Sequence, residues 1–133
     1  MVAVGERNVR PHKVLAVDDS KLMLKMYEMM LRAYPVVFAS DGPEALSRVV
    51  EHPDIDVVLL DINMPTMSGI EVLERLRADG ILPRLKVIIV STEGHEHEIE
   101  RGLAAGAAAY IPKPFDSQKI LGVIAELFKE PGR

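Results

Sequence analysis

Short apolar runs rich in β-branched residues alternate with longer segments of helical period along most of the chain, and this alternation strongly limits the folds open to it. The runs predict five strands, at residues 13–17, 36–39, 57–60, 87–90 and 108–111. The middle runs are apolar almost throughout, as in strands whose two faces are both covered. Strands that alternate with helices form parallel sheets with right-handed crossovers. The sequence therefore predicts an α/β fold, with a five-stranded parallel sheet and helices on both faces.

The segments between the strands carry apolar residues at helical spacing and the usual helix start and stop residues. Helices are expected after Ser20, to about residue 33, and over residues 43–50, 69–78, 96–105 and 117–129. The first helix contains four methionines, which are expected to pack in the core rather than to form a binding groove. They are Met23, Met26, Met29 and Met30.

A chain of 133 residues has room for one domain. Residues 1–12 lack the apolar stretch of a signal peptide and are expected to form a flexible N-terminal tail, residues 13–130 the domain, and residues 131–133 a C-terminal tail. No apolar run approaches the roughly 18 residues that a membrane span requires. We therefore expect a cytoplasmic protein that does not bind a membrane.

The composition excludes several classes of function. The chain has no cysteine, so zinc–thiolate sites, iron–sulfur clusters, disulfides and cysteine nucleophiles are ruled out. Its 16 Lys and Arg against 20 Asp and Glu give a net charge of −4, and no direct nucleic-acid binding is expected without a positive field. Neither the GxxxxGKS phosphate loop nor the GxGxxG dinucleotide fingerprint occurs.

Polar side chains stand at the ends of four predicted strands. The first strand runs into Asp18 and Asp19, the third into Asp61, the fourth into Ser91, and the fifth towards Lys113. The carboxyl ends of parallel strands share one edge of the sheet, where ligands bind, so these side chains are expected to converge. Carboxylates that come together repel one another unless a cation lies between them, and oxygen ligands suit Mg²⁺ or Mn²⁺.

A divalent metal held by one or two carboxylates usually binds phosphate oxygens as well, which indicates phosphoryl chemistry. An aspartate at a strand end can attack phosphorus and form an aspartyl phosphate, and Asp61 is best placed to do so. Each oxygen of the transferred group then needs a partner. We expect Mg²⁺, the ammonium of Lys113, and the hydroxyl of Ser91 with nearby backbone N–H groups to supply these partners.

The same residues make the sequence similar to the receiver domain of bacterial response regulators, the CheY-like family, over about residues 13–129. Asp18 and Asp19 resemble its acidic metal-binding pair, and Asp61 in DVVLLDINMP resembles its phosphoacceptor. Ser91, 30 residues beyond Asp61, resembles the hydroxyl residue, and Lys113, 22 residues further on, belongs to a KPF motif. The resemblance implies a flavodoxin-like (βα)5 sheet with strand order 2-1-3-4-5.

The resemblance also implies how such a domain works. Its phosphoacceptor takes a phosphoryl group from a phosphohistidine of a sensor histidine kinase or a phosphotransfer protein. The Mg²⁺ ligands carried over to this chain are Asp18, Asp19, Asp61 and the backbone carbonyl of Asn63. Apart from catalysing its own phosphorylation and dephosphorylation, such a domain is not an enzyme. The peptide bond between Lys113 and Pro114 is expected to be cis.

In the family, phosphorylation changes the surface formed by the fourth helix, the fifth strand and the fifth helix. Ser91 and Tyr110 match the two switch positions, and Asn63 and Glu93 match two positions that tune the loss of the phosphoryl group. The response passes to a downstream effector protein or a fused output domain, and phosphorylation-dependent dimerisation is a further option. Ser91 departs from the common pattern because Thr92, rather than a small residue, follows it.

Other interpretations of these residues stay open. Haloacid-dehalogenase-like phosphatases combine a strand-end aspartate, a hydroxyl residue, a lysine and Mg²⁺, but they usually need a longer chain and carry a second aspartate where this one has Asn63. A pseudo-receiver would act as an interaction module without phosphorylation. Asp19 and Ser20 also suit the N-cap of the first helix. His95 and His97 lie two residues apart and are expected to be solvated.

Overall fold

Five parallel strands form the centre of the structure, a computed structural model that describes residues 11–92 and 94–129. They are β1 (Val14–Val17), β2 (Val36–Ala39), β3 (Val57–Asp61), β4 (Lys86–Ser91) and β5 (Ala109–Pro112). Their order in the sheet is β2-β1-β3-β4-β5, and each neighbouring pair is parallel. The predicted α/β fold and strand order are therefore confirmed.

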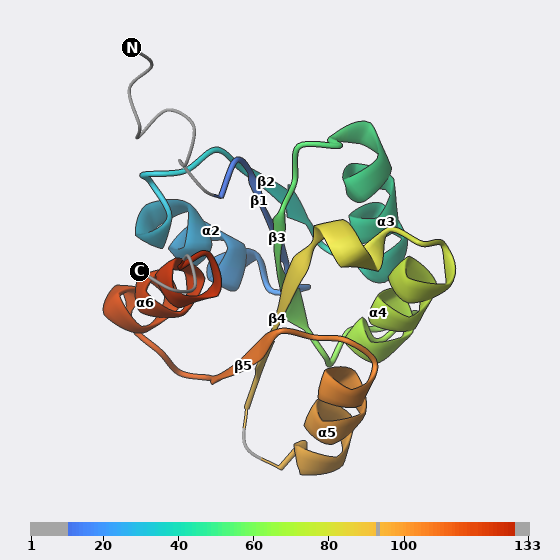
Figure 1. Ribbon diagram of the computed structural model, residues 1–133. Coiled ribbons are helices and arrows are strands. Elements are labelled where there is room, and N and C mark those ends of the chain that lie inside the picture. Colours follow the sequence, from blue (N-terminus) through green and yellow to red (C-terminus); the bar gives the residue numbers. More distant parts are fainter. Residues whose placement is uncertain (1–10, 93, 130–133) are drawn as a thin grey trace.

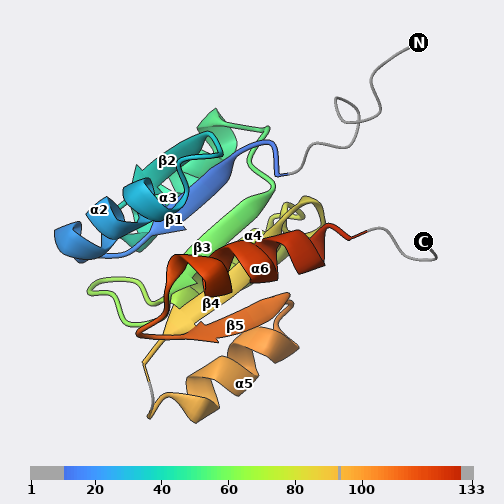
Figure 2. The same ribbon diagram turned by 90° about the vertical axis from the view of Figure 1, so that its left-hand side faces the viewer.

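The helices of the described residues cover both faces of this sheet (Figure 1 and Figure 2). They are α2 (Lys21–Met30), α3 (Gly42–Glu51), α4 (Gly69–Ala78), α5 (Glu96–Ala104) and α6 (Ser117–Leu127), and a short 3₁₀ helix (Leu82–Arg84) precedes β4. Alternate residues of β1 face opposite layers. Val14 and Ala16 pack with α2 and α6, whereas Leu15 and Val17 pack with α3 and α4. The sheet is thus buried between two helical layers.

Side-chain caps fix where several helices begin. The hydroxyl of Ser20 accepts a hydrogen bond from the backbone N–H of Met23, so Ser20 has the capping role that it suited in the sequence. α2 ends at Met30 instead of continuing to about residue 33. The chain must then turn into β2, and Pro35 disfavours a helical conformation in the residue before it.

The four methionines of α2 do not all pack in the core. Met29 is 70% exposed and Met26 is 37% exposed, and Leu22, on the same helical face, is 71% exposed. The prediction of core packing was therefore wrong for Met26 and Met29. Apolar residues continue around the helix, and only the face that carries the buried Tyr27 points to the sheet.

The start of the structure is attached to the loop before β3. The backbone N–H of His12 donates hydrogen bonds to both carboxylate oxygens of Asp56, at 3.0 and 2.9 Å. This attachment lies one residue outside the boundary expected at residue 13. Most of the two predicted tails, at residues 1–10 and 131–133, lies outside the described residues. Among the residues that the structure describes, no helix is long and apolar enough to cross a membrane.

Candidate functional site

The carboxyl ends of β1, β3, β4 and β5 bring the predicted polar residues together. Asp61 and Ser91 are the last residues of β3 and β4, and Asp18 follows β1 directly. All three are buried, with exposed fractions of 6%, 2% and 1% respectively. Lys113 follows β5, and its peptide bond with Pro114 is cis, as predicted. The site is therefore built on the ends of paired strands, which hold it rigidly.

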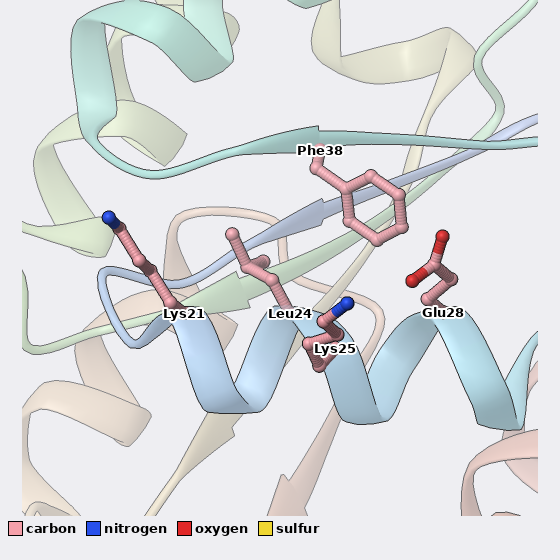
Figure 3. Close-up of a pocket in the computed structure, with 5 residues that line it drawn as sticks. All are labelled: Lys21, Leu24, Lys25, Glu28 and Phe38. Carbon is pink, nitrogen blue, oxygen red and sulfur yellow. The ribbon is translucent and has the colours of Figure 1, made fainter.

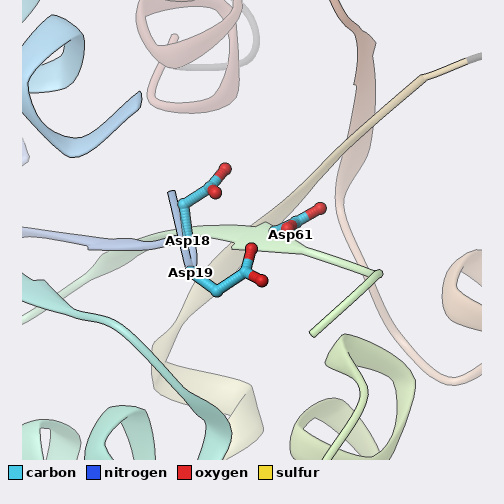
Figure 4. Close-up of side chains that lie close together, drawn as sticks. All are labelled: Asp18, Asp19 and Asp61. Carbon is cyan, nitrogen blue, oxygen red and sulfur yellow. The ribbon is translucent and has the colours of Figure 1, made fainter. Parts of the chain in front are cut away.

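Three carboxylates form the acidic part of the site (Figure 4). One oxygen from each of Asp18, Asp19 and Asp61 lies within 4.8 Å of the others. Two of these carboxylates are buried and that of Asp19 is exposed, so one side of the cluster is open to solvent. Oxygen ligands of this kind suit a hard cation such as Mg²⁺, and such an ion keeps further positions for water or phosphate. The donor set therefore fits the metal that the sequence indicates.

The ammonium of Lys113 lies beside two of these carboxylates. Its Nζ is 2.8 Å from Asp18 Oδ2 and 3.6 Å from Asp61 Oδ1. Burial by itself would lower the pKa of Lys113, but the hydrogen bond to Asp18 and the charges of both carboxylates raise it above its ordinary value. The lysine therefore stays positively charged, within reach of a group that binds to Asp61.

The electrostatic environment makes Asp61 costly to ionise. Burial, followed by the negative charge of Asp18, raises the pKa of Asp61 to about 6, against the opposing effect of Lys113. The backbone N–H of Asn63 also donates to Asp61 Oδ1, at 3.4 Å. A cation in the acidic cluster would favour the ionised carboxylate, which is the nucleophilic form.

The remaining predicted residues lie around this centre. The Ser91 hydroxyl donates to the carbonyl of Thr92 at 3.4 Å. Tyr110, on β5, is half-buried against an apolar cluster that includes Ile89 and Ile99. The side chain of Asn63 is exposed beside the site. Glu93 lies outside the described residues.

Tyr27, which was not among the predicted site residues, is fully buried in α2. Its ring stacks on that of Phe115 in the KPF motif, with centroids 6.0 Å apart. Its hydroxyl has no hydrogen-bond partner among the described residues. Burial, followed by the charges of Asp18 and Asp61, raises the pKa of this phenol, which therefore stays neutral. Only its apolar helical spacing marks Tyr27 in the sequence.

The prediction that His95 is solvated was wrong. Nε2 of His95 lies 3.1 Å from Nδ2 of Asn63, and only 24% of the side chain is exposed. The contact joins residues 32 positions apart, so no local pattern predicts it. His97, by contrast, is 95% exposed, as expected.

Comparison with known proteins identifies the family to which this fold belongs. The sequence model of the response regulator receiver domain matches residues 14–125. The chain therefore belongs to this family, whose members are signalling domains of two-component systems. Such domains bind Mg²⁺ at an acidic pocket and interact with histidine kinases or phosphotransferases and with effectors.

Within the family, the chain is similar to chemotaxis proteins of the CheY type. It is 34% identical to the chemotaxis protein CheY of Treponema pallidum over 133 residues, which cover 96% of this chain and 91% of that protein. A CheY homologue of Campylobacter jejuni is 36% identical over 109 residues, covering 80% of this chain and 84% of that protein.

The fold of the chain is also similar to solved structures of CheY proteins. The CheX–CheY–BeF₃–Mg²⁺ complex from Borrelia burgdorferi matches with a TM-score of 0.81 and 33% identity, covering 93% of this chain and 98% of that one. CheY4 of Vibrio cholerae matches with a TM-score of 0.79 and 33% identity, covering 86% and 96%. The chain is thus a CheY-like receiver domain.

Proposed function

We propose that this receiver domain accepts a phosphoryl group on Asp61 from a phosphohistidine of a sensor histidine kinase or a phosphotransfer protein in the cytoplasm. Mg²⁺, or Mn²⁺ in its place, is bound by Asp18, Asp19, Asp61 and the backbone carbonyl of Asn63. One observation carries the proposal: the buried carboxylate of Asp61 lies both in the acidic cluster and 3.6 Å from the Lys113 ammonium.

The transfer is a displacement at phosphorus. A carboxylate oxygen of Asp61 forms a bond to phosphorus while the bond to the donor's imidazole nitrogen breaks, and that nitrogen keeps the electron pair. The ammonium of Lys113 binds one oxygen of the transferred group, and the Ser91 hydroxyl turns from the Thr92 carbonyl to bind another. A bound Mg²⁺ supplies positive charge that offsets the repulsion between the acidic cluster and the phosphoryl oxygens.

The phosphorylated state then changes the surface formed by α5, β5 and α6. New negative oxygens on Asp61 compete with Asp18 for the Lys113 ammonium, which stands between β5 and α6. Ser91 and Tyr110 act as the two switch residues, since Ser91 ends β4 and Tyr110 lies on the neighbouring β5. The changed surface binds a downstream effector, a fused output domain or a second copy of the chain.

The exposed face of α2 suits the protein that donates the phosphoryl group. α2 begins two residues after Asp19, so its first turn is next to the acidic cluster. Its apolar residues Leu22, Met26 and Met29 face solvent. Beside them, a shallow hollow lies between α2 and β2 (Figure 3), lined by Lys21, Leu24, Lys25, Glu28 and Phe38. Exposed apolar area next to a reactive site is typical of a protein-binding surface.

The proposal is tested by incubating the protein with Mg²⁺ and acetyl phosphate and measuring its intact mass. We expect a gain of one phosphoryl group that is lost in Asp61→Asn. Asp54→Asn is the matched control, because Asp54 lies before β3, at the opposite end of the strand from Asp61. The absence of any gain would support an unphosphorylated pseudo-receiver, and repeated turnover of phosphomonoesters would support a haloacid-dehalogenase-like phosphatase.

A further inference from the structure

Near the phosphoacceptor, the imidazole of His95 lies between two polar side chains. Its Nε2 is 3.1 Å from Nδ2 of Asn63, and its Nδ1 is 3.5 Å from Oε1 of Glu98. His95 precedes the first residue of α5, but its side chain makes no capping hydrogen bond. The ring therefore links the start of α5 to the loop that follows β3, rather than stabilising the end of its own helix.

The partners of this ring decide its hydrogen-bond polarity. In a neutral imidazole, the Glu98 carboxylate beside Nδ1 favours the tautomer that carries its hydrogen on Nδ1, pointing at the carboxylate. Nε2 then carries a lone pair and accepts a hydrogen bond from the NH₂ group of Asn63. If the carboxamide of Asn63 were flipped, its oxygen would face Nε2 of His95, and two hydrogen-bond acceptors would lie against each other. His95 and Glu98 together therefore hold the carboxamide of Asn63 with its nitrogen towards the ring.

This orientation matters because Asn63 follows Asp61 by two residues and its backbone N–H already donates to the Asp61 carboxylate. With the amide nitrogen held by His95, the carboxamide oxygen is the free end of the side chain. Among the residues that the structure describes, this oxygen has no hydrogen-bond partner. It is thus available to accept a hydrogen bond from water beside the phosphoacceptor.

We propose that His95 is a positioning residue for the hydrolysis of phosphorylated Asp61, an inference that rests on the function proposed above. In this step a water oxygen forms a bond to phosphorus, and the bond between phosphorus and the Asp61 carboxylate oxygen breaks. The electron pair stays on the carboxylate, and the water's proton passes to the departing phosphate. The Asn63 oxygen accepts a hydrogen bond from the attacking water, and His95 keeps that oxygen in place.

The test measures the lifetime of the phosphorylated protein. The chain is phosphorylated with acetyl phosphate and Mg²⁺ and desalted, and the loss of phosphoprotein is followed at about pH 8, where an ordinary imidazole is neutral. We expect His95→Leu to lose its phosphoryl group about three- to tenfold more slowly, as for the loss of one hydrogen bond. His95→Gln should stay within about twofold of the unmodified chain, because its side-chain oxygen can also accept from Asn63.

The chain offers a matched control in His97→Leu. His97 lies two residues further on, within α5, and faces Glu100 at the same spacing, but its side chain is 95% exposed, and among the described residues it makes no hydrogen bond to Asn63. The phosphorylated His97→Leu protein should have the same lifetime as the phosphorylated unmodified chain. His95→Leu should also be phosphorylated by acetyl phosphate as fast as the unmodified chain and have the same melting temperature, which excludes a general effect on the fold.

A double variant isolates the route through Asn63. If His95 acts by orienting this carboxamide, His95→Leu has no further effect in an Asn63→Ala background. The inference is overturned if His95→Leu hydrolyses as fast as the unmodified chain or faster, or if its slowing adds fully to that of Asn63→Ala. Failure of the unmodified chain to be phosphorylated at all would instead overturn the proposed function, and the inference with it.

Discussion

The ammonium of Lys113 is closer to Asp18 than to the phosphoacceptor, at 2.8 Å from the Asp18 carboxylate and 3.6 Å from that of Asp61. In the unphosphorylated site, the ammonium of Lys113 offsets the charge of the Asp18 carboxylate, which is only 1% exposed. The same ammonium can move to a phosphoryl oxygen on Asp61 with a small displacement. Lys113 therefore stabilises the unphosphorylated site and is available to bind the phosphorylated one.

Removal of this lysine should destabilise the metal-free protein. Lys113→Ala leaves the buried Asp18 carboxylate without its hydrogen-bond donor, and we expect a loss of about 1–3 kcal/mol in the free energy of unfolding. Urea unfolding in EDTA measures this loss, and Lys119→Ala, which removes an exposed lysine of α6, serves as the control. Phosphorylation by acetyl phosphate should also slow. Equal stability of the two variants would contradict the assigned role of the Lys113–Asp18 pair.

Removal of the Asp61 charge should have the opposite effect. Because the folded-state pKa of Asp61 is raised to about 6, its protonated form favours the fold at low pH, and this contribution is lost as the pH rises through 6. In EDTA, Asp61→Asn should therefore exceed the unmodified chain in stability by about 1–3 kcal/mol at neutral pH, with a smaller difference near pH 4. Thermal unfolding across this range measures the difference. A less stable Asp61→Asn protein at pH 7 would contradict the electrostatic account.

Gly69 should tolerate no larger residue. A Cβ at this position would overlap the carbonyl oxygen of Asp61, so Gly69→Ala should shift the phosphoacceptor strand. We expect a loss of about 2 kcal/mol or more in stability and a large loss of phosphorylation by acetyl phosphate. The control is Gly122→Ala in α6, where a Cβ would meet nothing within 4 Å. That change should instead add about 0.5–1 kcal/mol, the usual helix preference for alanine. Similar behaviour of the two variants would contradict the close approach at Gly69.

Thr66 stores backbone strain in the loop after β3. Its φ of 74° lies in the left-handed region, which β-branched residues rarely adopt. Thr66→Asn should raise the free energy of unfolding by about 0.5–1 kcal/mol, because asparagine tolerates this conformation better. Chemical denaturation measures the gain. Thr92→Asn changes another exposed threonine, without a positive φ, and should give no such gain; equal gains would argue against strain at Thr66.

The main features of the site could be predicted because they follow from topology. Asp18, Asp61 and Lys113 stand at the ends of predicted strands, and parallel pairing necessarily places those ends at one edge of the sheet. The family resemblance supplied the strand order and the cis peptide bond, which spacing alone does not determine.

Features that depend on distant packing could not be predicted. The spacing of Met26 and Met29 indicates a helix but not which of its apolar residues the sheet covers. The contact of His95 with Asn63 depends on where α5 begins relative to the loop after β3. The exposure of the α2 face and the His95 contact therefore had to come from the three-dimensional structure.

Asp61 is proposed as the phosphoacceptor of a Mg²⁺-dependent site. Digestion of the protein after incubation with acetyl phosphate, with and without EDTA, locates the phosphoryl group by mass spectrometry. We expect up to one phosphoryl group per chain, on the peptide that contains Asp61, and its loss both in EDTA and in Asp61→Asn. A phosphoryl group on another residue, or one that forms equally well in EDTA, would rule out this role of Asp61.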